Sequence, residues 1–396
     1  MLVGLVSTLS LASVALALSP SYNSCPAQPR NVALKNNTHL PDPFTFEDGQ
    51  KVKTKQQWQC RREELKSLFE EYELGTLPGP PEHLSASLNA SNLTITAATN
   101  GATISFSVNI TLPTTGKAPF PAVIAFDGLS IPVPSNVATI VFAVSAFGVQ
   151  NDPSSRDVGT FYDLFGHNAT ASALMAWAWG VGRIIDALEI TPSAKINTKK
   201  LAVTGCSRNG KGALVAGAFN DRIALTIPQE SGSGGTSCWR ISDAMLRDNQ
   251  STQTASEIVG ENVWESLSFD QFANDTDLLP FDHHELLGLV APRGLIVIDN
   301  SDYLWLGPES SWGCTGAARL IYSALGVTDN IGLSNVANHS HCAFPMAREL
   351  PDLMAFYDKF LLNQPANTDI FYAVPNITLT VGDLAYWANW KVPKLS

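Results

Sequence analysis

The sequence is poor in charged side chains, and basic ones are the scarcer kind. Only 15% of its 396 residues are charged, against about a quarter in a typical soluble domain. Its 25 lysines and arginines face 36 aspartates and glutamates, which gives a formal net charge of −11. A protein that follows a phosphate backbone needs a basic stripe, and the sequence shows none. The composition therefore argues against nucleic acid and anionic membranes as partners.

Long apolar runs are also missing beyond the N-terminus. No later stretch approaches the roughly 18 apolar residues that a membrane-spanning helix needs. Residues 1–17 contain an apolar run that ends in Ala15-Leu16-Ala17, a small-x-small cleavage site. No Lys or Arg precedes the run, so a signal anchor is the alternative, although the run is short for a bilayer span. We interpret residues 1–17 as a signal peptide and expect residues 18–396 to be secreted into the extracellular medium.

Two further features are typical of secretion. The cysteine count is even, which suits disulfide bonds in an oxidising compartment: Cys25, Cys60, Cys206, Cys238, Cys314 and Cys342. Nine Asn-x-Ser/Thr sequons, each a possible surface glycan, begin at Asn36, Asn89, Asn92, Asn109, Asn168, Asn249, Asn274, Asn338 and Asn376. Together they predict a eukaryotic glycoprotein with disulfide bonds.

The order of hydrophobic patterns predicts one α/β domain. Three alternating segments predict antiparallel strands at the leading edge of a sheet: Leu84–Asn89, Leu93–Thr99 and Thr103–Leu112. Short apolar runs then predict strands buried on both faces: Ala122–Phe126, Thr139–Val144, Lys200–Cys206, Ile223–Pro228, Leu295–Asp299 and Ile331–Val336. Helices are predicted at Arg61–Tyr72, Ala169–Leu188, Lys211–Phe219 and Pro345–Leu362. This alternation indicates a mostly parallel sheet with helices on both faces, a three-layer sandwich.

A candidate nucleophile lies at the carboxyl end of a predicted strand, where such sheets bind ligands. Ser207 stands between that strand and the next helix, the context of a nucleophile elbow. Free N–H groups at the helix N-terminus can stabilise an oxyanion there. The usual pattern G-x-S-x-G is broken, because Asn209 takes the place of the second glycine and Gly210 follows it. By pattern alone, a helix N-cap in a glycine turn is the alternative reading of Ser207.

A histidine after the last predicted strand would complete the arrangement. In α/β hydrolases the chain order is nucleophile, acid, histidine. His339 and His341 both follow the strand predicted at Ile331–Val336, and only one predicted helix comes after them. Spacing does not choose between the two histidines.

The cysteines favour His341. Cys206 directly precedes Ser207, and Cys342 directly follows His341. A disulfide holds its two Cα atoms roughly 5.5–6 Å apart. A Cys206–Cys342 bond would therefore bring nucleophile and base together for proton transfer. Six cysteines allow 15 pairings, and with this one the remaining pairs would be Cys25–Cys60 and Cys238–Cys314.

The acid is less clear from the residues. Asp299 and Asp302 follow the strand before the histidine strand, which is the usual place for the acid. Glu230 follows the strand before that one. Spacing alone favours Asp299.

Four segments resemble the fungal glucuronoyl esterases of carbohydrate esterase family 15. They are Gly205–Lys211, with the pattern G-C-S-R-x-G-K, and Pro228–Gly235, Trp305–Glu309 and His339–Cys342. The resemblance implies an α/β-hydrolase fold from about residue 25 to the C-terminus. It also implies hydrolysis of esters between 4-O-methyl-glucuronic acid of glucuronoxylan and lignin alcohols, without metal or cofactor.

The resemblance further implies roles for single residues. It implies Glu230 as the acid in place of Asp299, and Arg208 as the stabiliser of the oxyanion. The implied sugar contacts are Lys211, Gln253, Glu261 and Trp305. Lys211 has independent support, since it lies four residues after Ser207 and so faces the same way on the predicted helix. Without the resemblance, Trp305 is equally a core residue, and Gln253 and Glu261 are solvated loop residues.

Alternatives to this function follow from the same residues. Another secreted carbohydrate esterase, for acetyl or feruloyl esters, or an inactive hydrolase-fold binding protein would share the fold. A metal site at His283-His284-Glu285 is disfavoured, because adjacent histidines point apart on a helix. Many family members carry a cellulose-binding module and linker, and none is recognised in this sequence. We expect a monomer, and we expect Asn338 to be unglycosylated because a glycan there would crowd the histidine loop.

Overall fold

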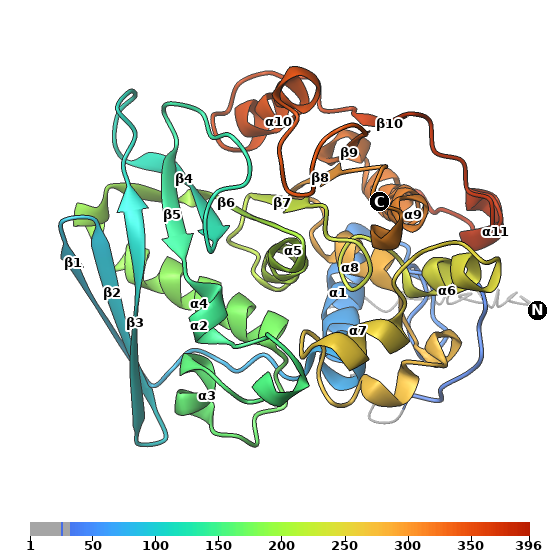
Figure 1. The fold of residues 1–396 in the computed structure, drawn as a ribbon, viewed down its shortest axis with the longest axis horizontal. Helices are drawn as coiled ribbons and strands as arrows, with labels where there is room; N and C mark the ends of the chain where they lie inside the picture. The colour runs from blue at the N-terminus through green and yellow to red at the C-terminus, as the bar shows by residue number, and fades with distance from the viewer. Residues whose placement is uncertain (1–24, 27–31) are drawn as a thin grey trace, which may run out of the picture.

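A ten-stranded mixed sheet forms the centre of the protein (Figure 1). The computed structural model describes residues 25–26 and 32–396, so the predicted signal peptide, residues 1–17, lies outside the described residues. The strand order is β1-β2-β3-β5-β4-β6-β7-β8-β9-β10. The bounds are β1 His83–Asn89, β2 Asn92–Thr99, β3 Ala102–Thr111, β4 Phe120–Phe126, β5 Ala138–Phe142, β6 Ile196–Cys206, β7 Leu225–Gln229, β8 Gly294–Asp299, β9 Ile331–Val336 and β10 Phe371–Val374.

The pairing of the strands confirms the predicted sheet. The pairs β1–β2, β2–β3 and β3–β5 are all antiparallel. From β5 to β10 every neighbouring pair is parallel. The fold is therefore the mostly parallel α/β sheet, with antiparallel leading strands, that the hydrophobic pattern predicts.

Helices cover both faces of the sheet. Their bounds are α1 Lys55–Phe69, α2 Val144–Phe147, α3 Thr160–Phe165, α4 Ala173–Glu189, α5 Arg208–Phe219, α6 Trp239–Arg247, α7 Ala255–Glu261, α8 His283–Leu289, α9 Pro308–Leu325, α10 Met346–Phe360 and α11 Leu384–Trp387. Val203 of β6 packs into the larger core with α4, α5, α8 and α9, whereas its neighbour Ala202 packs into a smaller core with Leu353 and Phe356 of α10. Successive strand residues face opposite sides, so both faces of β6 are buried.

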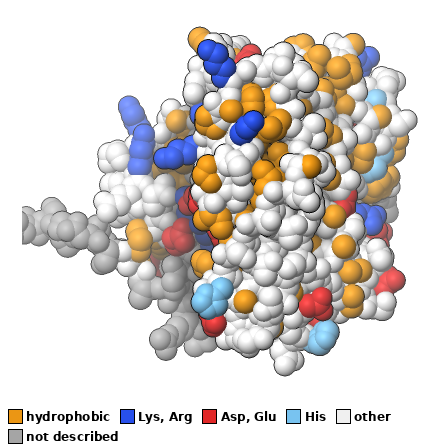
Figure 2. Space-filling model, turned by 90° about the vertical axis from the view of Figure 1, so that its left-hand side faces the viewer, with side chains coloured by type: hydrophobic (Ala, Val, Ile, Leu, Met, Phe, Trp, Pro, Cys, Tyr) orange, Lys and Arg blue, Asp and Glu red, His pale blue; other side chains and the backbone are white. Residues whose placement is uncertain are grey.

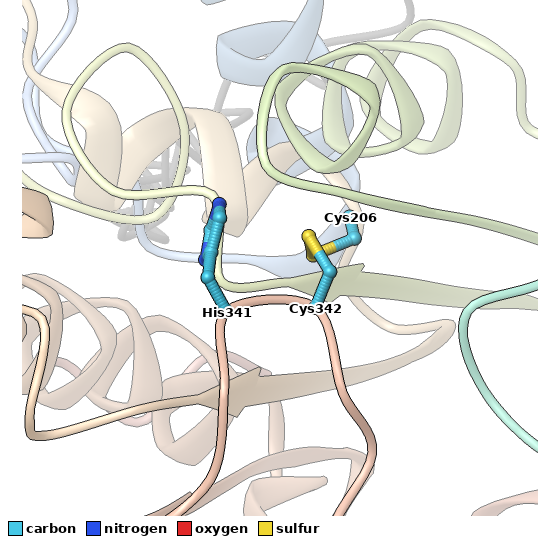
Figure 3. Close-up of side chains that lie close together, drawn as sticks. All are labelled: Cys206, His341 and Cys342. Carbon is cyan, nitrogen blue, oxygen red and sulfur yellow. A yellow bond between two sulfur atoms is a disulfide. The ribbon is translucent and has the colours of Figure 1, made fainter.

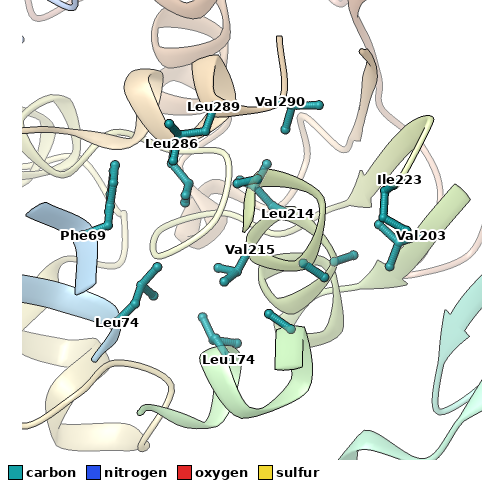
Figure 4. Close-up of a cluster of buried hydrophobic side chains, with 14 of the residues drawn as sticks. Phe69, Leu74, Leu174, Val203, Leu214, Val215, Ile223, Leu286, Leu289 and Val290 are labelled. Atoms are coloured by element: carbon teal, nitrogen blue, oxygen red, sulfur yellow. The ribbon is translucent and has the colours of Figure 1, made fainter. Parts of the chain in front are cut away.

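Helix α5 lies at the centre of the larger core (Figure 4). Its side chains Leu214 and Val215 lie among Leu174 of α4 and Leu286 and Leu289 of α8, and all five are buried. Burying a leucine or valine side chain stabilises a fold by roughly 1.5–3 kcal/mol. This packing fixes the helix whose N-terminus carries Ser207.

Two helices begin at places that capping decides. Helix α1 begins at Lys55, six residues before the predicted start, because the hydroxyl of Thr54 accepts a hydrogen bond from the N–H of Gln57 at 3.1 Å. Helix α4 begins at Ala173, where Ser172 caps it by accepting from the N–H of Met175. Both caps are of the Ser/Thr type that is common at helix N-termini. The start of α1 was predicted too late because its first turn is polar and shows no hydrophobic period.

The chain after the histidine loop was predicted incompletely. The expectation that only one helix follows Ile331–Val336 is wrong, because β10 and α11 come after α10. Strand β10 has four residues and pairs in parallel with β9 at the edge of the sheet. So short a run has no period of its own, and the free edge of β9 decides that it is a strand.

Three disulfide bonds join the six cysteines: Cys25–Cys60, Cys206–Cys342 and Cys238–Cys314. These are the three predicted pairs, and the prediction is confirmed. None of the helices within the described ranges combines the length and apolar character that a membrane crossing needs. On the side of the molecule where β1 lies, uncharged side chains predominate (Figure 2), as the low charged fraction of the sequence predicts.

Candidate active site

Ser207 sits in a tight turn between β6 and α5. Its backbone has φ 59° and ψ −128°, and a positive φ is rare for a residue with a side chain. A Cβ atom on Gly205 would lie 2.4 Å from the carbonyl oxygen of Asn209, and one on Gly210 would lie 2.7 Å from that of Gln229. The glycines that the turn requires are therefore Gly205 and Gly210. This explains why Asn209 is tolerated where the usual pattern has glycine.

A disulfide joins this turn to the loop after β9. The Cα atoms of Cys206 and Cys342 are 5.7 Å apart, within the spacing expected from the sequence. A ring nitrogen of His341 lies within 4.8 Å of both sulfur atoms. Figure 3 shows the imidazole beside the disulfide, with the three side chains arriving from two loops that are far apart in the sequence. The structure thus places His341 next to the residue that precedes Ser207.

Glu230 supports the imidazole from behind. Nδ1 of His341 donates to Oε2 of Glu230 at 2.7 Å, and the N–H of Cys342 donates to the same oxygen at 3.1 Å. The carboxylate is fully buried, at the end of β7. Nδ1 of His339, the alternative histidine, lies farther away, 3.8 Å from Oε1 of Glu230, and its Nε2 donates to the carbonyl oxygen of Val336 at 3.0 Å. The structure therefore pairs Glu230 with His341.

Asp299, the acid favoured by spacing, ends the next strand, β8. It is buried and accepts a hydrogen bond from the N–H of Asn300. Burial raises the pKa of Asp299 to about 7, and the charge of Glu230 adds to this shift. The structure thus directs Glu230, not Asp299, at the imidazole of His341, and the expectation from spacing alone is corrected here. The two acids stand at the ends of adjacent parallel strands, so the prediction from spacing chose the strand next to the one that bonds His341.

Two cationic side chains follow the turn on α5. The ammonium of Lys211 and the guanidinium of Arg208 lie 5.1 Å and 5.4 Å from the centre of the Trp264 ring. Lys211 is 2% exposed, and its ammonium donates to the carbonyl oxygen of Ser231 at 2.5 Å and to that of Ser233. Burial lowers the pKa of Lys211 to about 8, although nearby carboxylates oppose the shift. The two residues that the family resemblance singled out therefore share one aromatic neighbour.

The remaining three predicted contacts lie together at one cavity. The side-chain amide of Gln253 donates to Oε2 of Glu261 at 3.1 Å, and its backbone N–H donates to the carbonyl oxygen of Trp305 at 2.8 Å. The cavity measures about 430 Å³ and is lined by Ser251, Thr252, Gln253, Glu257, Glu261 and Trp305. The Trp305 ring is 39% exposed and lies 5.4 Å from that of His341. Trp305 is thus an exposed ring beside the histidine and not a core residue.

Two supporting residues were not identified from the sequence. The hydroxyl of Tyr303 accepts from the backbone N–H of His341 at 2.8 Å, and its ring packs against the imidazole at 5.4 Å. Trp264 was missed because it lies in a segment with no motif. Tyr303 could have been suspected from its place two residues before Trp305.

The His283-His284-Glu285 segment is part of the structural interior. Nε2 of His283 lies 2.6 Å from Oε1 of Glu73, and its Nδ1 donates to the carbonyl oxygen of Gly235 at 2.6 Å. His284 bonds to the carbonyl oxygen of Pro41 at 2.9 Å. The two imidazoles have separate partners, as the helical spacing predicts.

The sheet, the serine turn at the carboxyl end of β6 and the histidine loop after β9 define this protein as an α/β hydrolase. Its sequence matches the family model described as "Glucuronyl esterase, fungi" over residues 95–326. The 4-O-methyl-glucuronoyl methylesterase of Phanerochaete carnosa is 50% identical over 99% of this chain and 98% of its own. That of Hypocrea jecorina is 49% identical over 94% of this chain and 80% of its own.

Solved structures agree with the sequence matches. The glucuronoyl esterase catalytic domain from Hypocrea jecorina has a TM-score of 0.90 and 49% identity, over 93% of this chain and all of that chain. A serine-to-alanine variant of the Sporotrichum thermophile glucuronoyl esterase, in complex with methyl 4-O-methyl-β-D-glucopyranuronate, has a TM-score of 0.90 and 46% identity over 94% of this chain and all of that chain. The chain belongs to the fungal glucuronoyl esterase family and is a carboxylic ester hydrolase.

Proposed function

We propose that this protein hydrolyses esters between 4-O-methyl-D-glucuronic acid of glucuronoxylan and lignin alcohols, with Ser207, His341 and Glu230 as its catalytic triad. The observation that carries the proposal is the 2.7 Å hydrogen bond between His341 and Glu230. It lies on a loop that a disulfide joins to the serine turn. The methylesterase names of the relatives and the methyl uronate bound to the Sporotrichum relative support the uronate ester as substrate.

The first step forms an acyl-enzyme. The hydroxyl oxygen of Ser207 attacks the ester carbonyl carbon while Nε2 of His341 takes the hydroxyl proton. Glu230 holds Nδ1 and stabilises the imidazolium that results. The oxyanion is stabilised by N–H groups at the start of α5 and by Arg208, because an anion at a helix N-terminus meets unpaired donors. The C–O bond to the alcohol then breaks, and the alcohol leaves with the proton of the imidazolium.

The second step hydrolyses the acyl-enzyme and regenerates free Ser207. A water molecule gives a proton to His341 and attacks the acyl carbon, and the bond to Ser207 breaks as its oxygen regains the proton. The products are free glucuronate on xylan and the alcohol. The balance needs only water, and no step calls on a metal or a cofactor.

The sugar is held on the side of the cavity that Gln253, Glu261 and Trp305 line. An exposed indole suits stacking on a pyranose face, and the amide and carboxylate suit its hydroxyls. Lys211 reaches the same region from α5, because the hydroxyl of Ser233, whose carbonyl it contacts, donates to the carbonyl oxygen of Gln253 at 2.7 Å. These contacts favour a uronate over a plain acetyl group.

We also propose that the enzyme acts outside the cell. Residues 1–17 would be removed as a signal peptide, and residues 18–396 would act as a monomeric catalytic domain. Three disulfide bonds support this location, because such bonds persist in oxidising compartments. Glycans on the sequons are part of the same proposal, with Asn338 left free.

A panel of ester substrates tests the proposed reaction. The secreted protein should hydrolyse methyl 4-O-methyl-glucuronate and a benzyl glucuronate at least tenfold faster than acetylated xylan or methyl ferulate. Ser207→Ala should lower kcat by roughly 10⁶ while the variant keeps the melting temperature of the wild type. A preference for acetyl or feruloyl esters would transfer the protein to another substrate class. Full activity of the Ser207→Ala variant would reject the triad.

A further inference from the structure

Two consecutive residues lie beneath the cations of the active site. Trp264 is 3% exposed, and its indole N–H donates to Oε1 of Gln150 at 2.6 Å, which fixes the ring. The ring lies against both the ammonium of Lys211 and the guanidinium of Arg208. A cation within about 6 Å of an indole centre is attracted by its π electrons, and more strongly when water is excluded. One ring therefore helps to hold two like charges in place.

The next residue, Glu265, is buried beside the stem of Lys211. A Cβ atom added to Gly234 would lie 3.1 Å from Oε1 of Glu265 and 3.6 Å from Cδ of Lys211, so the two side chains are neighbours. Both carboxyl oxygens of Glu265 are buried and accept no hydrogen bond from any residue that the structure describes. A buried carboxyl without donors is costly to keep. Its place beside a buried ammonium gives it a partner by charge.

The ammonium itself has one hydrogen to spare. A lysine ammonium has three N–H donors, and the described contacts of Lys211 take two of them, for the carbonyl oxygens of Ser231 and Ser233. The third is left for a ligand. It is available only while the amine is protonated, and burial works against protonation by lowering the pKa to about 8.

The charges around this pair come from several elements. Burial, and after it the charge of Glu73, raise the pKa of Glu265, whereas Lys211 and Arg156 lower it. Glu261 and Glu265 favour the charged form of Lys211, and Arg208 opposes it. Glu73 is itself paired with His283. The surrounding groups are therefore Glu73, Arg156, Arg208, Glu261 and His283.

We propose that Trp264 and Glu265, together called the cation seat, are positioning residues for uronate binding: the ring fixes both cations, and the carboxyl keeps Lys211 protonated so that its third N–H can bind a sugar hydroxyl. As the pH rises, Glu265 ionises, and its negative charge then retains the proton on Lys211. Removal of the carboxyl takes this support away. The inference rests on the proposed function, since it takes Lys211 as a sugar contact.

The test compares Glu265→Gln with Glu265→Asp on methyl 4-O-methyl-glucuronate between pH 5 and pH 9. We expect Glu265→Gln to raise KM roughly twofold at pH 7 and roughly tenfold at pH 9, because less of Lys211 keeps the proton that its third hydrogen bond needs, with kcat changed less than threefold. The alkaline fall of kcat/KM should move to lower pH by about one unit. Glu265→Asp keeps the charge, so it should restore most of the wild-type pH profile.

Variants of Trp264 test whether the ring acts on the two cations or only fills space. Trp264→Leu should raise KM and also lower kcat, because Arg208 loses the ring as well, whereas Trp264→Phe should keep much of both. Asp243→Asn is the matched control: it removes a half-buried carboxylate that contacts Thr276, and it should leave the pH profile unchanged. Equilibrium binding of free 4-O-methyl-glucuronate checks that the changes in KM reflect affinity.

Failure of the seat and failure of the proposed function give different results. A folded Glu265→Gln enzyme with wild-type KM and the same alkaline limb would overturn the cation seat and leave the esterase intact. If Glu265→Gln does not fold, the comparison of Trp264→Leu with Trp264→Phe tests the cation seat. Equal KM values in these two variants would overturn the proposal. A wild-type protein inactive on uronate esters would instead remove the proposed function.

Discussion

One oxygen of Glu230 accepts hydrogen bonds from the imidazole of His341 at 2.7 Å and from the backbone N–H of Cys342 at 3.1 Å. The second bond holds the carboxylate to the chain next to the disulfide, so that the acid, the histidine loop and the serine turn form one connected unit. Charge-assisted bonds of this kind are stronger than neutral ones. The imidazole is thereby oriented before any substrate arrives.

This arrangement predicts unequal roles for the two buried acids. Glu230→Gln should lower kcat by about 10³–10⁴, because a neutral amide neither fixes the Nδ1–H tautomer nor stabilises the imidazolium. Asp299→Asn should lower kcat less than tenfold, since Asp299 does not bond the imidazole. Steady-state kinetics on methyl 4-O-methyl-glucuronate measure both. A larger loss in Asp299→Asn than in Glu230→Gln would reverse the assignment of the acid.

The disulfide beside the histidine should matter for rate as well as for stability. The Cys206–Cys342 bond spans 136 residues and the Cys25–Cys60 bond spans 35. In the chain-entropy model their removal costs about 5 and about 4 kcal/mol of unfolding free energy. Replacing either pair by serines should therefore lower the stability similarly, as urea unfolding would measure. Only the Cys206/Cys342 double variant should also lower kcat at 20 °C, by at least tenfold. Equal kcat in both variants would contradict a positioning role for this bond.

Glu349 of α10 makes the fold less stable as the pH rises. Burial, and after it the charges of Asp299 and Glu230, raise the pKa of Glu349 from 4.5 to about 9. Between these values the unfolded chain releases the proton that the native state keeps, so unfolding becomes easier with rising pH. Glu349→Gln removes this dependence.

The Glu349→Gln variant should be as stable as the wild type at pH 4 and more stable at pH 8 by about 1–3 kcal/mol, the range for a buried polar group without full compensation. Urea unfolding at both pH values measures this. Glu71→Gln, at an exposed site, should change neither value by more than about 0.5 kcal/mol. If the free energy of unfolding has the same pH dependence in Glu349→Gln and in the wild type, the pKa of Glu349 is not raised in the native state.

The serine turn should not accept a methyl group at position 205. A Cβ atom on Gly205 would overlap the backbone of Asn209 at 2.4 Å. Gly205→Ala should therefore destabilise the protein by about 1–3 kcal/mol, as overpacking does, and should also lower kcat by shifting Ser207. Gly260, within α7, has nothing within 4 Å of its Cβ position. Gly260→Ala is therefore the control and should be neutral or stabilise by up to about 1 kcal/mol. Wild-type thermal stability of Gly205→Ala would contradict the steric requirement for glycine in the serine turn.

Much of the fold was readable from the sequence, because buried strands and amphipathic helices each have their own hydrophobic period. The nine strands predicted from Leu84–Asn89 to Ile331–Val336 were found within a few residues of their bounds. Strand β10 was not, since a four-residue edge strand depends on the neighbour that it joins. The Cys206–Cys342 pair was also predictable, because Cys206 and Cys342 flank the two residues that the chemistry requires to meet.

The sequence by itself determined the serine turn, the histidine loop and the bond between them, since each is written in adjacent residues. The local pattern left the acid open between Glu230 and Asp299; the family resemblance implied Glu230, and the tertiary structure shows Glu230 facing His341. Only the tertiary structure decided where Lys211, Trp264 and Glu265 lie relative to one another. Glu230 and Asp299 end neighbouring strands, and a shift of one strand across a parallel sheet leaves no trace in the local pattern. Contacts between residues far apart in the chain come from packing, which a one-dimensional pattern does not contain.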